Sequence, residues 1–156
     1  MIVDFTRVAR LNGAMKVAII SGTSIARSGI FDDCELHLAS TPFGEIEYKE
    51  SSGVVVINRH GFLNPLPPHR SNYRGYVHLL KKLDVQATLS INSVGSLTDD
   101  LPPGSLVSCS DYVSFAPITF IDDAPSGFAP SIDNGFLGEI EPRLSCPVSK
   151  DRVYAQ

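Results

Sequence analysis

The sequence predicts an α/β domain, and three observations lead to that prediction. Short apolar runs bounded by Gly, Pro, Asp or Ser recur along the chain and are typical of strands. Residues 71–83 have apolar side chains spaced by three and four, which predicts a helix. This helix lies between two strand-like runs, 53–58 and 85–92, and that order predicts a right-handed crossover between parallel strands.

Each predicted strand is a run that stops at a turn-forming residue. The first starts at Lys16 and ends in a Gly-Thr-Ser turn, as a parallel strand does where it enters a loop. The other predicted strands cover residues 34–40, 44–50, 53–58 and 85–92. Residues 1–14 have no clear period, so we expect an N-terminal extension ahead of a single domain over residues 15–156.

The predicted helix is amphipathic. Its apolar stripe consists of Tyr73, Tyr76, Val77, Leu80 and Leu83. Ser71 is placed as its N-cap, because a serine hydroxyl can accept from a free backbone amide of the first turn. Gly75 inside the helix costs about 1 kcal/mol relative to alanine, which burial of the stripe can offset.

Composition limits the class of protein. The 156 residues carry 13 Lys and Arg against 17 Asp and Glu and contain no basic run, so we expect no nucleic-acid partner. No apolar run approaches the ~20 residues that span a bilayer, and we expect no membrane association and a cytoplasmic location. The three separated cysteines contain no Cys-x-x-Cys pair, and no His/Cys/Asp cluster has metal-ligand spacing, which favours neither disulfides nor a metal site.

Three of the predicted strands end in residues suited to binding an anion. The first is followed by the small-residue turn 21–24, the fourth by Arg59, His60 and Gly61, and the fifth by the turn 92–96. Amides and hydroxyls of small turns can surround an anion, and a permanently charged guanidinium matches phosphate oxygens. Because ligands of α/β sheets bind beyond the carboxyl ends of the strands, these turns predict one phosphate-sized pocket.

Each signal also has a structural interpretation. Gly-Thr-Ser after a strand is most often an ordinary turn, and this one lacks the further glycines of a dinucleotide site and a Walker lysine. Arg-His at a strand end also fits a solvated edge or an ion pair. Asn and Gly in the turn 92–96 also serve the needs of the backbone. His37, His69 and His78 are interpreted as packing, loop or surface residues.

Six short blocks stand in order along the chain. They are Gly22-Thr23, Thr41-Pro42-Phe43-Gly44, Arg59-His60-Gly61, Pro68-His69-Arg70-Ser71-Asn72-Tyr73, Val94-Gly95-Ser96-Leu97 and Pro103-Gly104. Together they resemble the trimeric purine nucleoside phosphorylase family, most closely its methylthioadenosine and methylthioinosine phosphorylases. The resemblance implies the N-terminal part of a three-layer α/β/α fold with a twisted mixed central sheet, with the C-terminal half absent from residues 15–156.

The resemblance implies phosphorolysis of a purine nucleoside to a free base and (methylthio)ribose 1-phosphate. The residues that it implies for phosphate binding are Thr23, Arg59, His60, Asn92 and Ser93. No residue is assigned as acid or base, because charge placement and orientation supply most of the rate in this chemistry. Phosphate is the co-substrate and no cofactor is expected. The candidate nucleosides are 5'-methylthioadenosine, 5'-methylthioinosine and inosine, and the implied assembly is a homo-oligomer, a trimer or a multiple of it.

The sequence also departs from the family pattern. Asn64 stands where close relatives often have histidine, and Ser21 and Ser24 replace glycines. The residues that the family uses for the ribose and the purine are expected in the half that these 156 residues do not include. Two hypotheses therefore stay open: an enzyme of purine nucleoside phosphorolysis, or a non-catalytic module that binds phosphate or a nucleoside.

Overall fold

The computed structural model describes residues 15–114, 125–126, 132–144 and 147–155. The chain divides into two compact units with their boundary between Val94 and Gly95, and each unit is described by itself. The extension predicted for residues 1–14 lies outside the described residues.

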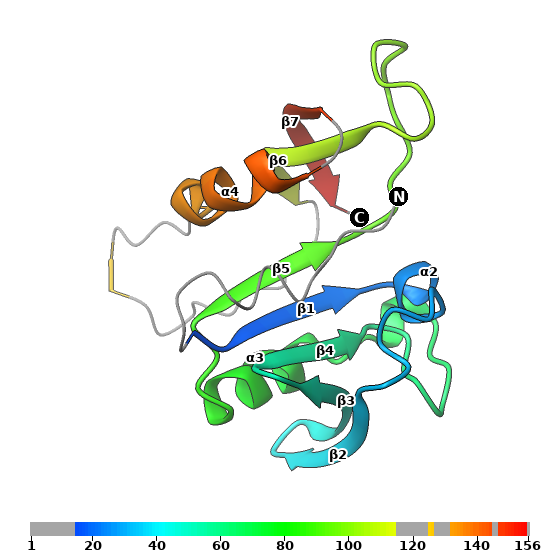
Figure 1. The fold of residues 1–156 in the computed structure, drawn as a ribbon, viewed down its shortest axis with the longest axis vertical. Helices are drawn as coiled ribbons and strands as arrows, with labels where there is room; N and C mark the ends of the chain where they lie inside the picture. The colour runs from blue at the N-terminus through cyan, green and yellow to red at the C-terminus, as the bar shows by residue number, and fades with distance from the viewer. Residues whose placement is uncertain (1–14, 115–124, 127–131, 145–146, 156) are drawn as a thin grey trace. The chain divides into compact units, whose positions relative to one another are not determined.

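The first unit contains a five-stranded mixed sheet in the order β2-β3-β4-β1-β5 (Figure 1). Strands β1, β4 and β5 are parallel, whereas β2 and β3 form an antiparallel hairpin next to β4. All five strands predicted from the sequence are present, so the α/β prediction is confirmed. Their bounds are β1 (Val17–Ser21), β2 (Glu35–Thr41), β3 (Gly44–Ser51), β4 (Val54–Asn58) and β5 (Ala87–Ile91).

The central strands are apolar because both of their faces are covered. In β4, Val55, Val56 and Ile57 are completely buried, and β1 contributes the buried Ala18 and Ile19. A continuous run of branched apolar residues is what a strand buried on two sides requires. The edge strand β2 has no fully buried residue, as expected where one side of a strand faces solvent.

Helix α3 (Tyr73–Lys82) lies on one face of this sheet (Figure 1), and its buried side chains pack against the strands. The helix was predicted, but its buried stripe differs from the prediction, because Leu79 is 1% exposed whereas Val77 is 55% and Tyr73 44% exposed. The core under the helix is one cluster of buried residues. Its members are Ala18, Ile46, Val55, Ile57, Tyr76, Leu79 and Leu80.

The predicted N-cap of α3 is wrong by one residue. Asn72 caps the helix, since its Oδ1 accepts from the backbone amide of Gly75 over 3.0 Å. The Ser71 hydroxyl donates instead to the carbonyl oxygen of Arg59 over 3.1 Å. A short 3₁₀ turn, η1 (Pro68–Arg70), precedes the cap. The serine is therefore used to hold a neighbouring loop, and the asparagine begins the helix.

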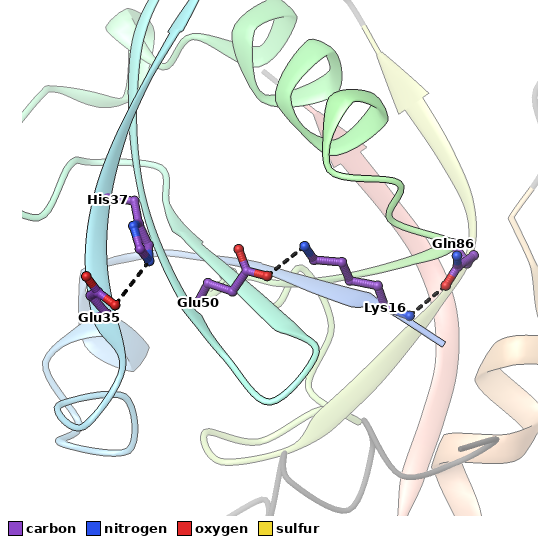
Figure 2. A network of polar contacts seen from close by, with 5 residues as sticks. All are labelled: Lys16, Glu35, His37, Glu50 and Gln86. Carbon is purple, nitrogen blue, oxygen red and sulfur yellow. Dashed lines mark hydrogen bonds and ion pairs between the residues drawn. The ribbon is translucent and has the colours of Figure 1, made fainter. Parts of the chain in front are cut away.

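The amino-terminal ends of the parallel strands are joined by polar contacts. Figure 2 shows Lys16, just before β1, between Glu50 of β3 and Gln86, just before β5. The Lys16 Nζ atom lies 2.6 Å from Glu50 Oε1, and the Lys16 backbone amide donates to Gln86 Oε1 over 2.6 Å. These contacts lie at the end of the strands opposite to their carboxyl ends.

The second unit pairs β6 (Leu106–Ser114) with β7 (Val148–Ala155) in parallel, with a register shift between Cys109 and Asp111. Helix α4 (Asn134–Ile140) is capped by Asp133, whose Oδ1 accepts from the Phe136 amide over 3.1 Å. The 3₁₀ turn η2 (Glu141–Arg143) follows it. In the part of the chain that the structure describes, no helix has the length and apolar character to cross a membrane.

Candidate functional site

The carboxyl ends of three parallel strands meet at one edge of the sheet. Ser21, the last residue of β1, is in register with Asn58 of β4 and with Ile91 of β5. The backbone amide of Arg59 donates to the Ser21 carbonyl over 2.9 Å, which extends the pairing one residue past the strands. The turns that follow these strands therefore leave the sheet at the same level.

Gly22, the first residue after β1, lies against Arg59 and His60. A Cβ atom at Gly22 would be 3.6 Å from Arg59 Nη2 and 4.0 Å from His60 Nε2. Thr23 follows directly and begins the short helix α2 (Thr23–Ala26), a turn of helix that the sequence analysis did not predict. The turn after β1 and the turn after β4, both predicted to bind phosphate, are thus brought together. The backbone at Gly22 approaches the basic side chains of Arg59 and His60.

The backbone of Arg59 is held from both sides, while its guanidinium keeps unused donors. Its carbonyl oxygen accepts from Ser71 Oγ and from the Tyr76 hydroxyl, each over 3.1 Å. Burial raises the pKa of Tyr76, so this phenol stays protonated as a donor. The guanidinium makes one long contact, 3.5 Å from Nη1 to the Tyr73 hydroxyl, and its buried Nε has no hydrogen-bond partner in the described part of the chain.

His60 is fixed by contacts on its backbone and on its ring. Its amide donates to Asn58 Oδ1 over 3.1 Å, and its carbonyl accepts from the Leu66 amide over 2.8 Å. The ring Nδ1 lies 3.1 Å from the Leu66 carbonyl oxygen. Because a carbonyl oxygen only accepts, we assign the proton to Nδ1, which leaves Nε2 as an acceptor; Nε2 and Cδ2 are the ring atoms nearest to Gly22.

The turn after His60 depends on a glycine and on a carboxylate from β3. Gly61 has a φ of 78°, and a Cβ atom there would overlap the Asn64 carbonyl. Glu47 Oε2 accepts from the amides of Phe62 and Leu63 over 2.6 and 2.8 Å, and Oε1 accepts from Asn64 Nδ2 over 3.2 Å.

The charge state of Glu47 follows from these contacts. Partial burial on its own raises the pKa of this carboxyl, but the hydrogen bonds from Leu63, Phe62 and Asn64 outweigh it and hold the pKa below its usual value. Sequence reasoning missed Glu47 because it is one of several acidic residues in an alternating strand, and only its three-dimensional contacts distinguish it.

Asn92 and Ser93 follow β5 at the same edge, and both are exposed. Asn92 Nδ2 donates to Ser90 Oγ over 3.1 Å. Among the described residues, no hydrogen bond joins this turn to the turns at Thr23 and Arg59. The sheet therefore aligns the third predicted turn with the other two.

A cavity of about 250 Å³ lies beside the turn 60–66. Arg59 and His60 do not line it, so it is separate from the cluster that faces Gly22. Most of its polar lining groups already bond to other protein atoms, as Glu47 and Asn72 do. Its walls include Leu38, Glu45, Ile46, Glu47, Asn58, Leu63, Asn64, Leu66, Asn72 and Tyr76.

The fold and these blocks define a class of protein. Residues 16–144 match the family model described as the phosphorylase superfamily, and the chain belongs to this superfamily. It is 39% identical over 101 residues to the probable S-methyl-5'-thioinosine phosphorylase of Methanocaldococcus jannaschii, covering 64% of this chain and 39% of that protein. It is 32% identical over 149 residues to the probable 6-oxopurine nucleoside phosphorylase of Archaeoglobus fulgidus, covering 90% of this chain and 61% of that protein.

Solved structures give the same result. Methylthioadenosine phosphorylase from Schistosoma mansoni in complex with adenine matches with a TM-score of 0.58 and 33% identity, over 65% of this chain and 39% of that chain. The predicted nucleoside phosphorylase fold is therefore confirmed. The chain spans about two fifths of the length of the first of these relatives.

Proposed function

We propose that this chain binds inorganic phosphate at the carboxyl ends of β1, β4 and β5 and takes part in phosphorolysis of a purine nucleoside. The observation that supports this most is the approach of Arg59 and His60 to Gly22. It joins two of the six sequence blocks at the sheet edge where α/β proteins bind ligands. The products would be a free base and ribose 1-phosphate or its methylthio derivative.

In this proposal the protein orients an anion and does not activate a side chain as a nucleophile. Arg59 supplies bidentate, charge-assisted hydrogen-bond donors. The backbone at Gly22 and Thr23 can approach the phosphate closely because Gly22 has no side chain. His60 Nε2, which is the acceptor nitrogen when Nδ1 carries the proton, accepts from the hydroxyl of a singly protonated phosphate, and Asn92 and Ser93 complete the site. Phosphate attacks the anomeric carbon as the bond to the purine breaks, so positioning and electrostatics lower the barrier.

The substrate belongs to the same proposal. The activities for which the relatives are named favour 5'-methylthioadenosine, 5'-methylthioinosine or a 6-oxopurine nucleoside such as inosine. Phosphate is the co-substrate, no cofactor is required, and a cytoplasmic location is part of the same proposal. A homotrimer is supported by large apolar side chains that are exposed on the first unit. They include Leu38, Phe43, Leu63 and Val77.

The test is phosphate-dependent release of free base from these three nucleosides, with phosphate binding measured in parallel by calorimetry. Base release that requires phosphate and is lost in Arg59→Ala supports the enzyme. The second candidate is a binding module that holds phosphate without catalysis, and the approach of Arg59 and His60 to Gly22 supports it as well. Phosphate binding without base release identifies that module. A chain that neither binds phosphate nor releases base contradicts both.

A further inference from the structure

We propose that Glu47 is a positioning residue for the phosphate site, because its carboxylate fixes the turn 60–66 and thereby the ring of His60. This inference rests on the proposed function and extends it to a residue outside all six sequence blocks. Glu47 touches neither Arg59 nor His60 through any described hydrogen bond. It acts through the backbone that follows them.

The turn 60–66 is a loop closed by contacts between its two ends, and it donates hydrogen bonds to the Glu47 carboxylate. Two contacts between His60 and Leu66 close this loop. The Leu66 amide donates to the His60 carbonyl over 2.8 Å, and the imidazole Nδ1 of His60 lies 3.1 Å from the Leu66 carbonyl oxygen. Between these ends, the amides of Phe62 and Leu63 converge on Glu47 Oε2 at 2.6 and 2.8 Å. The position of the turn 60–66 is therefore set by its hydrogen bonds to β3 as well as by the contacts between its own two ends.

A carboxylate suits this position for physical reasons. Successive amides of a tight turn point the same way and form a concave donor surface, and an ionised carboxylate is their strongest protein acceptor. The amides of Phe62 and Leu63 have a defined direction, because the positive φ of Gly61 turns them toward β3. The acceptor side is rigid, because the neighbouring Ile46 is 2% exposed in the core. Lys49, also on β3, adds a contact 5.5 Å from the centre of the Phe62 ring.

Positioning and simple electrostatics predict opposite results. If the Glu47 charge acted on phosphate through space, its removal would tighten phosphate binding by relieving repulsion. If the carboxylate positions the turn, its removal weakens phosphate binding, because His60 and the backbone after Arg59 lose their fixed geometry. The direction of the change in affinity therefore separates the two roles.

The experiment is calorimetric titration of the full chain and its variants with inorganic phosphate. We expect Glu47→Ala to bind roughly tenfold more weakly, as loss of hydrogen bonds to a charged group implies. Glu47→Gln should fall between, since its amide oxygen still accepts from Phe62 and Leu63. Glu45→Ala is the matched control, because Glu45 is an exposed carboxylate two residues earlier in β3 that lines the same cavity. Equal or tighter binding by Glu47→Ala overturns the proposal.

A second readout does not depend on phosphate. The Nδ1-protonated form of the His60 ring is visible in nitrogen-proton NMR spectra, and we expect Glu47→Ala to lose this single form and to speed amide exchange at Phe62 and Leu63. If Glu47→Ala does not fold, the same measurements on Glu47→Gln decide. A wild-type chain that binds no phosphate contradicts the proposed function, whereas an unchanged His60 ring in the folded variant overturns the role of Glu47.

Discussion

The side-chain amide of Asn72 donates to the carbonyl oxygen of Phe43 over 2.7 Å and so joins the start of α3 to the turn between β2 and β3. The same side chain accepts from the Gly75 amide and caps the helix. One residue thus connects two sequence blocks that are 29 positions apart. The helix cannot move relative to the hairpin without breaking a hydrogen bond.

Substitution of Asn72 should separate these two contacts. Asn72→Asp keeps the cap but loses the donor to Phe43, and we expect a loss of about 1 kcal/mol in the free energy of unfolding. Asn72→Ala loses both, and we expect about 2 kcal/mol. Urea denaturation measures the difference. His69→Ala, in the exposed segment before the cap, is the control and should change stability by less than about 0.5 kcal/mol. Equal losses in the two Asn72 variants would contradict this division.

Gly75 and Gly138 should respond in opposite ways to alanine. A Cβ atom at Gly75 would lie 2.6 Å from Ile46 Cδ1 and 2.8 Å from Asn72 Nδ2, so we expect Gly75→Ala to destabilise the first unit by about 1–3 kcal/mol. Gly138 in α4 has open space at the same position, so Gly138→Ala should stabilise its helix by up to about 1 kcal/mol. Denaturation followed by amide exchange in each unit measures both. A stabilising Gly75→Ala would show that the close approach to β3 is not maintained.

Arg59 should control phosphate affinity with little effect on folding. Its backbone is held by Ser71, Tyr76 and Ser21, and none of these contacts requires the guanidinium. We expect Arg59→Ala to weaken phosphate binding by about ten- to a hundredfold. Arg59→Lys should recover only part of the phosphate affinity, because an ammonium cannot reproduce the bidentate geometry of the guanidinium. Calorimetry measures the affinities, with Arg70→Ala, exposed in η1, as the control. Wild-type affinity in Arg59→Ala would mean that the turn after β4 is not a phosphate ligand.

The stabilising effect of Glu47 should depend on pH in one direction. Its pKa in the folded chain is below the ordinary value of 4.5, so the folded state favours the ionised form. Its contribution is therefore fully present above the unfolded pKa and is lost as the pH falls through the folded pKa. The difference in unfolding free energy between wild type and Glu47→Gln should shrink on acidification below about pH 5. A difference that is constant from pH 7 to pH 3 would contradict the prediction. Glu45→Gln, on the same strand, is the control.

The strands could be predicted from the sequence because buried strand positions are occupied by apolar residues. The run Val54–Ile57 is apolar throughout since both of its faces are covered, and the pattern gives the strand without any knowledge of its neighbours. The same reasoning found α3 but not its cap. Ser71 and Asn72 are both good caps in isolation, and the choice depends on the Arg59 carbonyl, which competes for the serine hydroxyl.

The candidate site was predictable only in part for a similar reason. Arg59 and His60 stand out because basic residues that follow a buried strand are unusual, and the structure brings both against Gly22. Nothing in the local sequence distinguishes Glu47, because an acidic residue in a half-exposed strand is ordinary. Its role depends on three donors contributed by a turn that is distant in sequence, and no local pattern contains them.

The amide of Asn58 has a consequence for the chemical ageing of the protein. This residue is 6% exposed and uses both ends of its amide within its own turn, accepting from the His60 amide and donating to the Gly61 carbonyl. Slow hydrolysis of an asparagine amide exchanges one nitrogen for one oxygen and leaves the outline of the side chain unchanged. At Asn58 that exchange removes the donor and sets a negative charge against a carbonyl oxygen beside Arg59. Loss of the Asn58 amide, whether on storage or in an Asn58→Asp variant, should therefore weaken phosphate binding at the proposed site while the secondary structure stays intact.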